Sequence, residues 1–201
     1  KRIHKMKRLI FQAILTLAAV AGHAQANLDS LYNVWMNKSI SDSIRVSAYH
    51  DYVWKGYLDS HPDTIMQMTM ALHRFAEQRK YPRALAVAYS LQGSAAMEMK
   101  NYAIALEYYA QALEINESLG FKSGMASQHA NIGKIHHVLN DLNLALEHYK
   151  RGAQLLEDHK TTAGQSPLKN HKDQVLLGDL YNDMGTVYLK QGLFLKASGI
   201  L

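Results

Sequence analysis

The chain of 201 residues contains no cysteine. A disulfide, a thiolate metal site and a catalytic thiol are therefore excluded, and so is a lipid anchor attached through cysteine. The absence is compatible with an exported protein, because oxidising compartments permit disulfides and do not require them. A bacterial periplasm fits this composition.

The folded part of the chain also lacks a surplus of positive charge, although the formal net charge is +5. Of the 22 Lys and Arg residues, five lie within the first eight positions, and no acidic residue precedes Asp29. The remaining 17 basic residues equal the 17 Asp and Glu residues. Binding to nucleic acid requires a basic surface, so the sequence argues against a DNA or RNA partner.

Long hydrophobic runs are missing as well. The apolar run over residues 9–21 spans thirteen positions, which is short of the roughly 17–25 that a membrane span needs. Basic residues precede it and Ala24-Gln25-Ala26 follows it, as in a secretory signal peptide. We predict a signal peptide over 1–26 that is cleaved after Ala26, with an uncleaved anchor as the alternative. We expect no membrane span within 27–201.

No catalytic motif appears: the chain has no glycine-rich phosphate loop, no carboxylate pair at a useful spacing and no nucleophile motif. We therefore expect no enzyme, no cofactor and no metal site within these residues. His129 and His136 are interpreted as packing residues, with metal binding as the alternative. Met66 and Met70 are predicted to lie in the core, because residues two apart on a helix cannot bring three thioethers to one copper ion. Two buried tryptophans are expected, Trp35 and Trp54.

The chain does contain an internal repeat, and a repeat of this kind decides the architecture before local propensities do. Five positions recur at offsets of 0, 9, 12, 16 and 19 from a glycine, and they alternate between small and large apolar residues. The first set is Gly93, Tyr102, Ala105, Tyr109 and Ala112; the second is Gly133, Leu142, Ala145, Tyr149 and Gly152; the third is Gly185, Phe194, Ala197 and Leu201.

Between these positions the apolar residues recur every three or four residues, which predicts helices. Short turns are expected at Lys100-Asn101 and Asn140-Asp141, and Gly120 is placed to end a helix in a left-handed cap. The sequence thus predicts an all-α solenoid of antiparallel helix pairs. The small residues are expected at helix crossings, with the tyrosines filling the gaps around them.

The predicted organisation follows from these signals. Residues 27–82 hold a leading helix at 28–37 and a degenerate helix pair at 43–58 and 62–79, and residues 83–201 form the repeat array. Its repeats are expected at about 84–120, 123–158 and 173–201, the last incomplete. The interval from Gly133 to Gly185 is 12 residues longer than the 40-residue interval from Gly93 to Gly133. We place the excess in a solvated loop at 159–172, with a contact for an anionic partner as the alternative.

The pattern from Tyr89 and Gly93 through Tyr102, Ala105 and Tyr109 to Ala112 resembles the tetratricopeptide repeat. It departs from that family in its period of 40 rather than about 34 residues and in lacking the closing proline. The resemblance implies a concave groove, lined by the first helix of each pair, that binds a protein or peptide partner. The implied groove residues are Ser90, Ser94, Met97, Lys134, His137, Asn182 and Thr186. They do not reproduce the Lys and Asn clamp with which some family members bind C-terminal carboxylates.

The segments Leu28–Trp35 and Tyr52–Tyr57 resemble the leaders of exported bacterial receptors. In those proteins the repeats precede a membrane span and a histidine kinase or nucleotide cyclase domain. This resemblance implies a periplasmic sensory module whose catalytic domain lies outside these residues, and we expect the sequence to continue past Leu201. The alternative is a free-standing exported scaffold or adaptor in an envelope assembly.

Overall fold

The structure is a computed structural model that describes residues 27–162 and 171–192. The predicted signal peptide at 1–26, the centre of the predicted loop at 159–172, and Phe194 and Ala197 lie outside these residues. The chain divides into two compact units, with the boundary between Ser60 and His61.

The first unit pairs a helix at residues 27–36 with α2, Asp42–Tyr57. Trp35 is buried against Tyr49, with ring centroids 4.6 Å apart, and its carbonyl accepts a 2.9 Å hydrogen bond from Nε of Arg45. The prediction for Trp35 is confirmed, but that for Trp54 is wrong. Trp54 is 42% exposed, because it follows Val53 and so points away from the buried stripe of α2, stacking on His50 instead.

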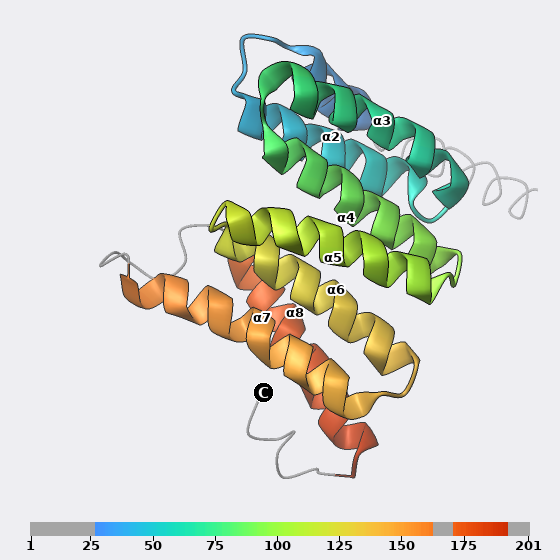
Figure 1. Ribbon diagram of the computed structural model, residues 1–201, viewed down its shortest axis with the longest axis vertical. Helices are drawn as coiled ribbons and strands as arrows, with labels where there is room; N and C mark the ends of the chain where they lie inside the picture. Colours follow the sequence, from blue (N-terminus) through green and yellow to red (C-terminus); the bar gives the residue numbers. More distant parts are fainter. Residues whose placement is uncertain (1–26, 163–170, 193–201) are drawn as a thin grey trace, which may run out of the picture. The chain divides into compact units, whose positions relative to one another are not determined.

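The second unit is a series of helices, and every regular element in the described part of the chain is helical (Figure 1). The all-α solenoid of helix pairs is thereby confirmed. Its members are α3 (Pro62–Arg79), α4 (Pro82–Glu98), α5 (Tyr102–Ser118), α6 (Lys122–Val138), α7 (Leu142–Thr162) and α8 (His171–Lys190). From α3 to α7 each helix begins 20 residues after the one before it, so a pair takes 40 residues.

One cap geometry ends α3, α4, α5 and α6, and it explains the missing proline. The backbone is left-handed at Lys80, Lys100, Gly120 and Asn140, with φ of 49°, 60°, 60° and 66°. After each of these residues the next N–H bonds back to the final turn, as from Asn101 to the Ala96 carbonyl at 2.8 Å. This is a Schellman motif, which stops a helix without proline. The turns predicted at 100–101 and 140–141 and the cap at Gly120 are confirmed.

The helices pack in sequence order, and the first helices of successive pairs also touch. Helix α4 contacts α6, and α6 contacts α8, whereas the described residues of α5 and α7 make no contact with each other. The first helices therefore lie along the inner side of the array and the second helices along its outer side. None of the described helices has the length and hydropathy that a membrane crossing requires.

The repeated small residues lie at helix contacts, as predicted, but the contact at the glycines is with a ring. A Cβ built on Gly93 would be 2.6 Å from Cε1 of Tyr109, and one on Gly133 would be 2.6 Å from Cε1 of Tyr149. Each glycine thus leaves room for the tyrosine of its own pair's second helix, rather than bringing two backbones together. Further small members of the repeat set are also buried, and they are Ala105, Ala112, Ala145, Gly152 and Gly185.

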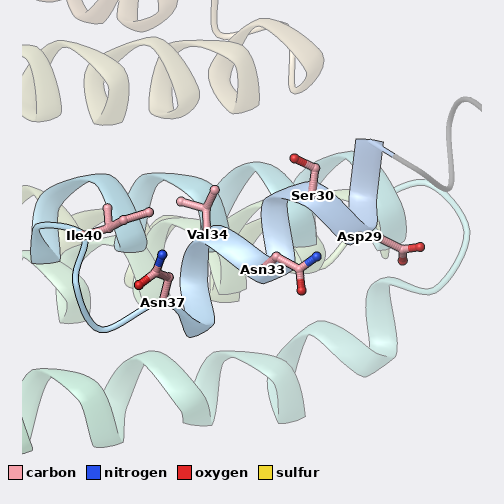
Figure 2. A pocket seen from close by; sticks show the side chains of 6 residues that line it. All are labelled: Asp29, Ser30, Asn33, Val34, Asn37 and Ile40. Carbon is pink, nitrogen blue, oxygen red and sulfur yellow. The ribbon is translucent and has the colours of Figure 1, made fainter.

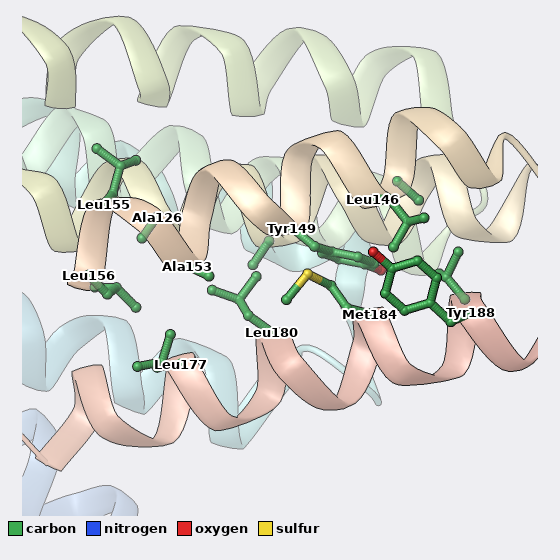
Figure 3. Close-up of a cluster of buried hydrophobic side chains, with 13 residues drawn as sticks. Ala126, Leu146, Tyr149, Ala153, Leu155, Leu156, Leu177, Leu180, Met184 and Tyr188 are labelled. Atoms are coloured by element: carbon green, nitrogen blue, oxygen red, sulfur yellow. The ribbon is translucent and has the colours of Figure 1, made fainter. Parts of the chain in front are cut away.

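Helix α8 completes the core of the second pair (Figure 3). Leu177, Leu180 and Met184 of α8 point toward α7, where Leu156 and Tyr149 are fully buried. The apolar face that α7 turns toward α8 is thereby covered. The insertion predicted as a loop is partly helical, because α7 continues to Thr162 and α8 starts at His171.

The prediction that Met66 and Met70 lie in the core is wrong. Their side chains are 36% and 58% exposed, whereas Ile65, Thr69 and Leu72 are fully buried. These three residues form the stripe of α3 that packs on α4, and each methionine follows a stripe residue, about 100° further around the helix.

Candidate binding surface

The residues implied for the groove lie on the three first helices of the array. Ser90 and Met97 are half-buried on α4, Lys134 and His137 are half-buried on α6, and Asn182 and Thr186 are exposed on α8. We call these six residues the first-helix surface. The contacts of α4 with α6 and of α6 with α8 make it continuous across the array.

Ser94 stands apart from the other implied groove residues because it is only 4% exposed. Its Oγ donates to the Ser90 carbonyl at 3.0 Å and shares a 3.0 Å hydrogen bond with the hydroxyl of Tyr109. Burial raises the pKa of Tyr109 to about 12, so the hydroxyl stays protonated. Ser94 therefore holds the Tyr109 ring in the space beside Gly93, and we leave it out of the first-helix surface.

Hydrogen bonds between side chains brace the inner side of the array. Nε2 of Gln92 donates to Oγ1 of Thr69 at 2.9 Å, which links α4 to α3. Nε2 of Gln128 donates to Oγ of Ser90 at 3.3 Å, which links α6 to α4. Both glutamines are buried, so the first bond holds α4 against the preceding second helix α3, and the second fixes the spacing of the first helices α4 and α6.

Asp183 adds a charge to the first-helix surface that the sequence reasoning missed. It lies half-buried on α8. Burial, with a smaller contribution from Asp179, raises the pKa of its carboxyl, while Lys134 and His137 act in the opposite direction. Lys134 and His137 of α6 therefore lie near an acid of α8. From the sequence, Asp183 could have been found as an acidic residue inside the apolar stripe of a helix.

A fully buried hydroxyl adjoins this charge cluster. The hydroxyl of Tyr149 has no hydrogen-bond partner among the described residues, and neither has Oδ2 of Asp183. Burial, with a smaller contribution from Asp183, raises the pKa of Tyr149 above its usual range. In the first pair Ser94 satisfies the equivalent hydroxyl of Tyr109, whereas the second pair has Lys134 at the position of Ser94. The polar centre of the first-helix surface thus lies between α6 and α8.

Two shallow depressions lie away from the first-helix surface, and their linings bring together no group of catalytic side chains. One adjoins the helix at 27–36 in the first unit (Figure 2), and its lining is Asp29, Ser30, Asn33, Val34, Asn37 and Ile40. The other lies at the turn between α6 and α7, where Nε2 of Gln191 donates to Oδ1 of Asn143 at 3.2 Å. Within the described ranges no three His, Asp or Glu side chains are grouped so that they could hold a metal ion.

Comparison with known proteins agrees with this geometry. The model of the tetratricopeptide repeat family matches residues 86–119, which cover most of α4 and α5. Among solved structures, the crystal structure of BtubC (BKLC) from P. vanneervenii superposes with a TM-score of 0.60 over 92% of this chain and 73% of that chain, at 16% identity. At this identity the likeness concerns the fold alone. No curated protein matches the sequence. The chain therefore contains a tetratricopeptide repeat within an all-α array of helix pairs.

Proposed function

We propose that the first-helix surface binds a protein or peptide partner. Tetratricopeptide repeats are protein-interaction modules, and the observation that supports this site most is the continuous contact of α4, α6 and α8. That contact places half-buried and exposed polar side chains from three helices along one face. Such a face suits an extended or helical peptide whose polar groups pair with Lys134, His137 and Asp183.

The test is to select peptides from a displayed library against the chain and to measure their affinity for variants by calorimetry. The double variant Lys134→Glu with His137→Ala should weaken binding at least tenfold, because it reverses one charge at the polar centre and removes a donor. Thr186→Arg, at an exposed position of α8, should also weaken binding, since the longer side chain obstructs the same face.

Glu107→Lys is the matched control, because it changes an exposed charge on the second helix α5 and leaves the first-helix surface intact. Circular dichroism is used to check that each variant is folded. Selected peptides that bind all three variants as tightly as the parent chain would place the binding site elsewhere.

We also propose that the chain is the exported, periplasmic sensory part of a bacterial membrane signalling protein. The basic start, the apolar run at 9–21 and Ala24-Gln25-Ala26 support export, and the resemblance of Leu28–Trp35 to receptor leaders supports the signalling role. In this proposal the output domain lies outside these residues, and partner binding to the array is the signal that it receives.

Export is tested by expressing the chain in a bacterial host and sequencing the N-terminus of the product. We expect periplasmic protein that starts at Asn27, and we expect Ala26→Arg to abolish cleavage, because the site requires small residues. Product that keeps residues 9–21 in the parent chain would show that the segment is an anchor or is not a signal.

A further inference from the structure

A depression on the outer side of the array lies between α6 and α7, away from the first-helix surface. Its volume is about 460 Å³. One residue of α6 and five of α7 line it: His129, Glu147, His148, Lys150, Arg151 and Gln154. We call it the histidine depression.

Two imidazoles of the histidine depression share a hydrogen bond, with Nδ1 of His129 3.1 Å from Nδ1 of His148. One neutral ring donates and the other accepts, and the accepting ring carries its own proton on Nε2. The pair therefore keeps one N–H donor that is not used between the rings. His136 also stacks on His148, with ring centroids 5.6 Å apart.

Positive charge dominates the rest of the lining. Lys150 and Arg151 are exposed, and Glu147 is the one acid that lines the depression. The guanidinium of Arg151 makes no hydrogen bond or ion pair with any other described residue, and Nζ of Lys150 lies 5.9 Å from the centre of the Tyr188 ring. Burial and the charges of His148 and Arg151 lower the pKa of His129 to about 4. The lining thus provides more hydrogen-bond donors and positive charge than its own hydrogen-bond acceptors can match.

The first pair provides an internal comparison, because it has the same fold 40 residues earlier. The residues at the six equivalent positions are Tyr89, Glu107, Tyr108, Ala110, Gln111 and Glu114. There two tyrosines stack with ring centroids 6.2 Å apart, and the lining carries two acids and no base. Helix packing therefore does not require histidines or bases here. Five of the six positions differ between the pairs, and the gain of two bases and the loss of one acid favour an anion.

We propose that the histidine depression binds a phosphate group. The planar guanidinium of Arg151 can donate two parallel hydrogen bonds to two phosphate oxygens, and Lys150 supplies a second cation. The free imidazole N–H can donate to a third oxygen. A phosphate offers a third acceptor oxygen and more negative charge than a carboxylate, so phosphate is favoured over it. The phosphate belongs to a free ion or to a phosphorylated side chain, and both share this chemistry.

The test uses the histidine signals of the whole chain in NMR spectra at pH 7.5, at constant ionic strength. The probes are inorganic phosphate, N-acetyl-phosphoserine amide and, as the control anion, acetate. We expect saturable shifts of the His129 and His148 signals with at least one phosphate probe, and no shift of His73 on α3. The matched variant is Lys150→Ala with Arg151→Gln, which places the first pair's residues at these exposed positions. It should lower the affinity at least tenfold.

The outcome also separates the two sources of phosphate. Shifts with inorganic phosphate alone indicate a site for the free ion, and shifts with the phosphoserine probe alone indicate a phosphorylated side chain. Shifts that do not saturate, that acetate reproduces, or that the double variant retains in full would overturn the site. The result is independent of peptide binding, because none of the residues involved belongs to the first-helix surface.

Discussion

Gly93→Ala is expected to destabilise the protein by about 1–3 kcal/mol, although alanine is normally the better helix former. The new Cβ would lie 2.6 Å from Cε1 of Tyr109, closer than carbon atoms approach in folded proteins. The ring cannot turn away freely, because its hydroxyl is bonded to the buried Ser94. Either the ring is displaced, which breaks that bond, or α4 and α5 move apart. Urea denaturation monitored by circular dichroism measures the loss.

The same substitution at Gly178 is the control and should have the opposite sign. Gly178 is exposed within α8, and a Cβ there would meet nothing within 4 Å. Gly178→Ala should therefore stabilise the protein by about 0.5–1 kcal/mol, because the unfolded chain loses freedom and nothing is obstructed. If the two variants changed the free energy of unfolding equally, the close contact between Gly93 and Tyr109 would be absent in solution.

The free energy of unfolding is expected to fall between pH 7.5 and pH 4.5 by about 1–3 kcal/mol because of the histidine pair, after allowance for solvent screening. Burial lowers the pKa of His129 to about 4, and His148 and Arg151 add to this effect. Burial and His136 also lower the pKa of His148, and Glu147 opposes them. In the unfolded chain both groups titrate near 6.5. As the pH drops through this window, the unfolded state binds more protons than the folded state, so stability declines.

The variant His129→Tyr with His148→Tyr isolates this effect, because it installs the ring pair that the first repeat carries at the same positions. It should lose less stability over the same pH range than the parent chain. Burial raises the pKa of Asp183, so this carboxyl adds to the free energy of unfolding as the pH falls. Its contribution is the same in the parent chain and in the variant. Equal losses in the parent chain and in the variant would show that the histidines are not the source. Denaturation in urea at the two pH values provides the comparison.

Both predictions depend on pairs of residues that the sequence places 16 to 19 positions apart. The repeat indicated that Gly93 and Tyr109 matter together, but not that the ring occupies the space of the missing Cβ. Ser94 looked like a groove residue, because its helical register places it beside Ser90. Only the packing of α5 on α4 brought the Tyr109 hydroxyl to it. The register of one helix says which side a residue is on, and the neighbouring helix decides whether that side is covered.

The sequence by itself determined the helices, their turns and their pairing. These follow from local physics, since the apolar period specifies a helix and a left-handed residue such as Gly120 ends it. The tertiary structure alone decided the exposure of Trp54 and Met70, the approach of Asp183 to Lys134, and the pairing of His129 with His148. Burial and pKa depend on which helices meet and on how closely they pack. That distance is a property of the assembled array, and no short segment encodes it.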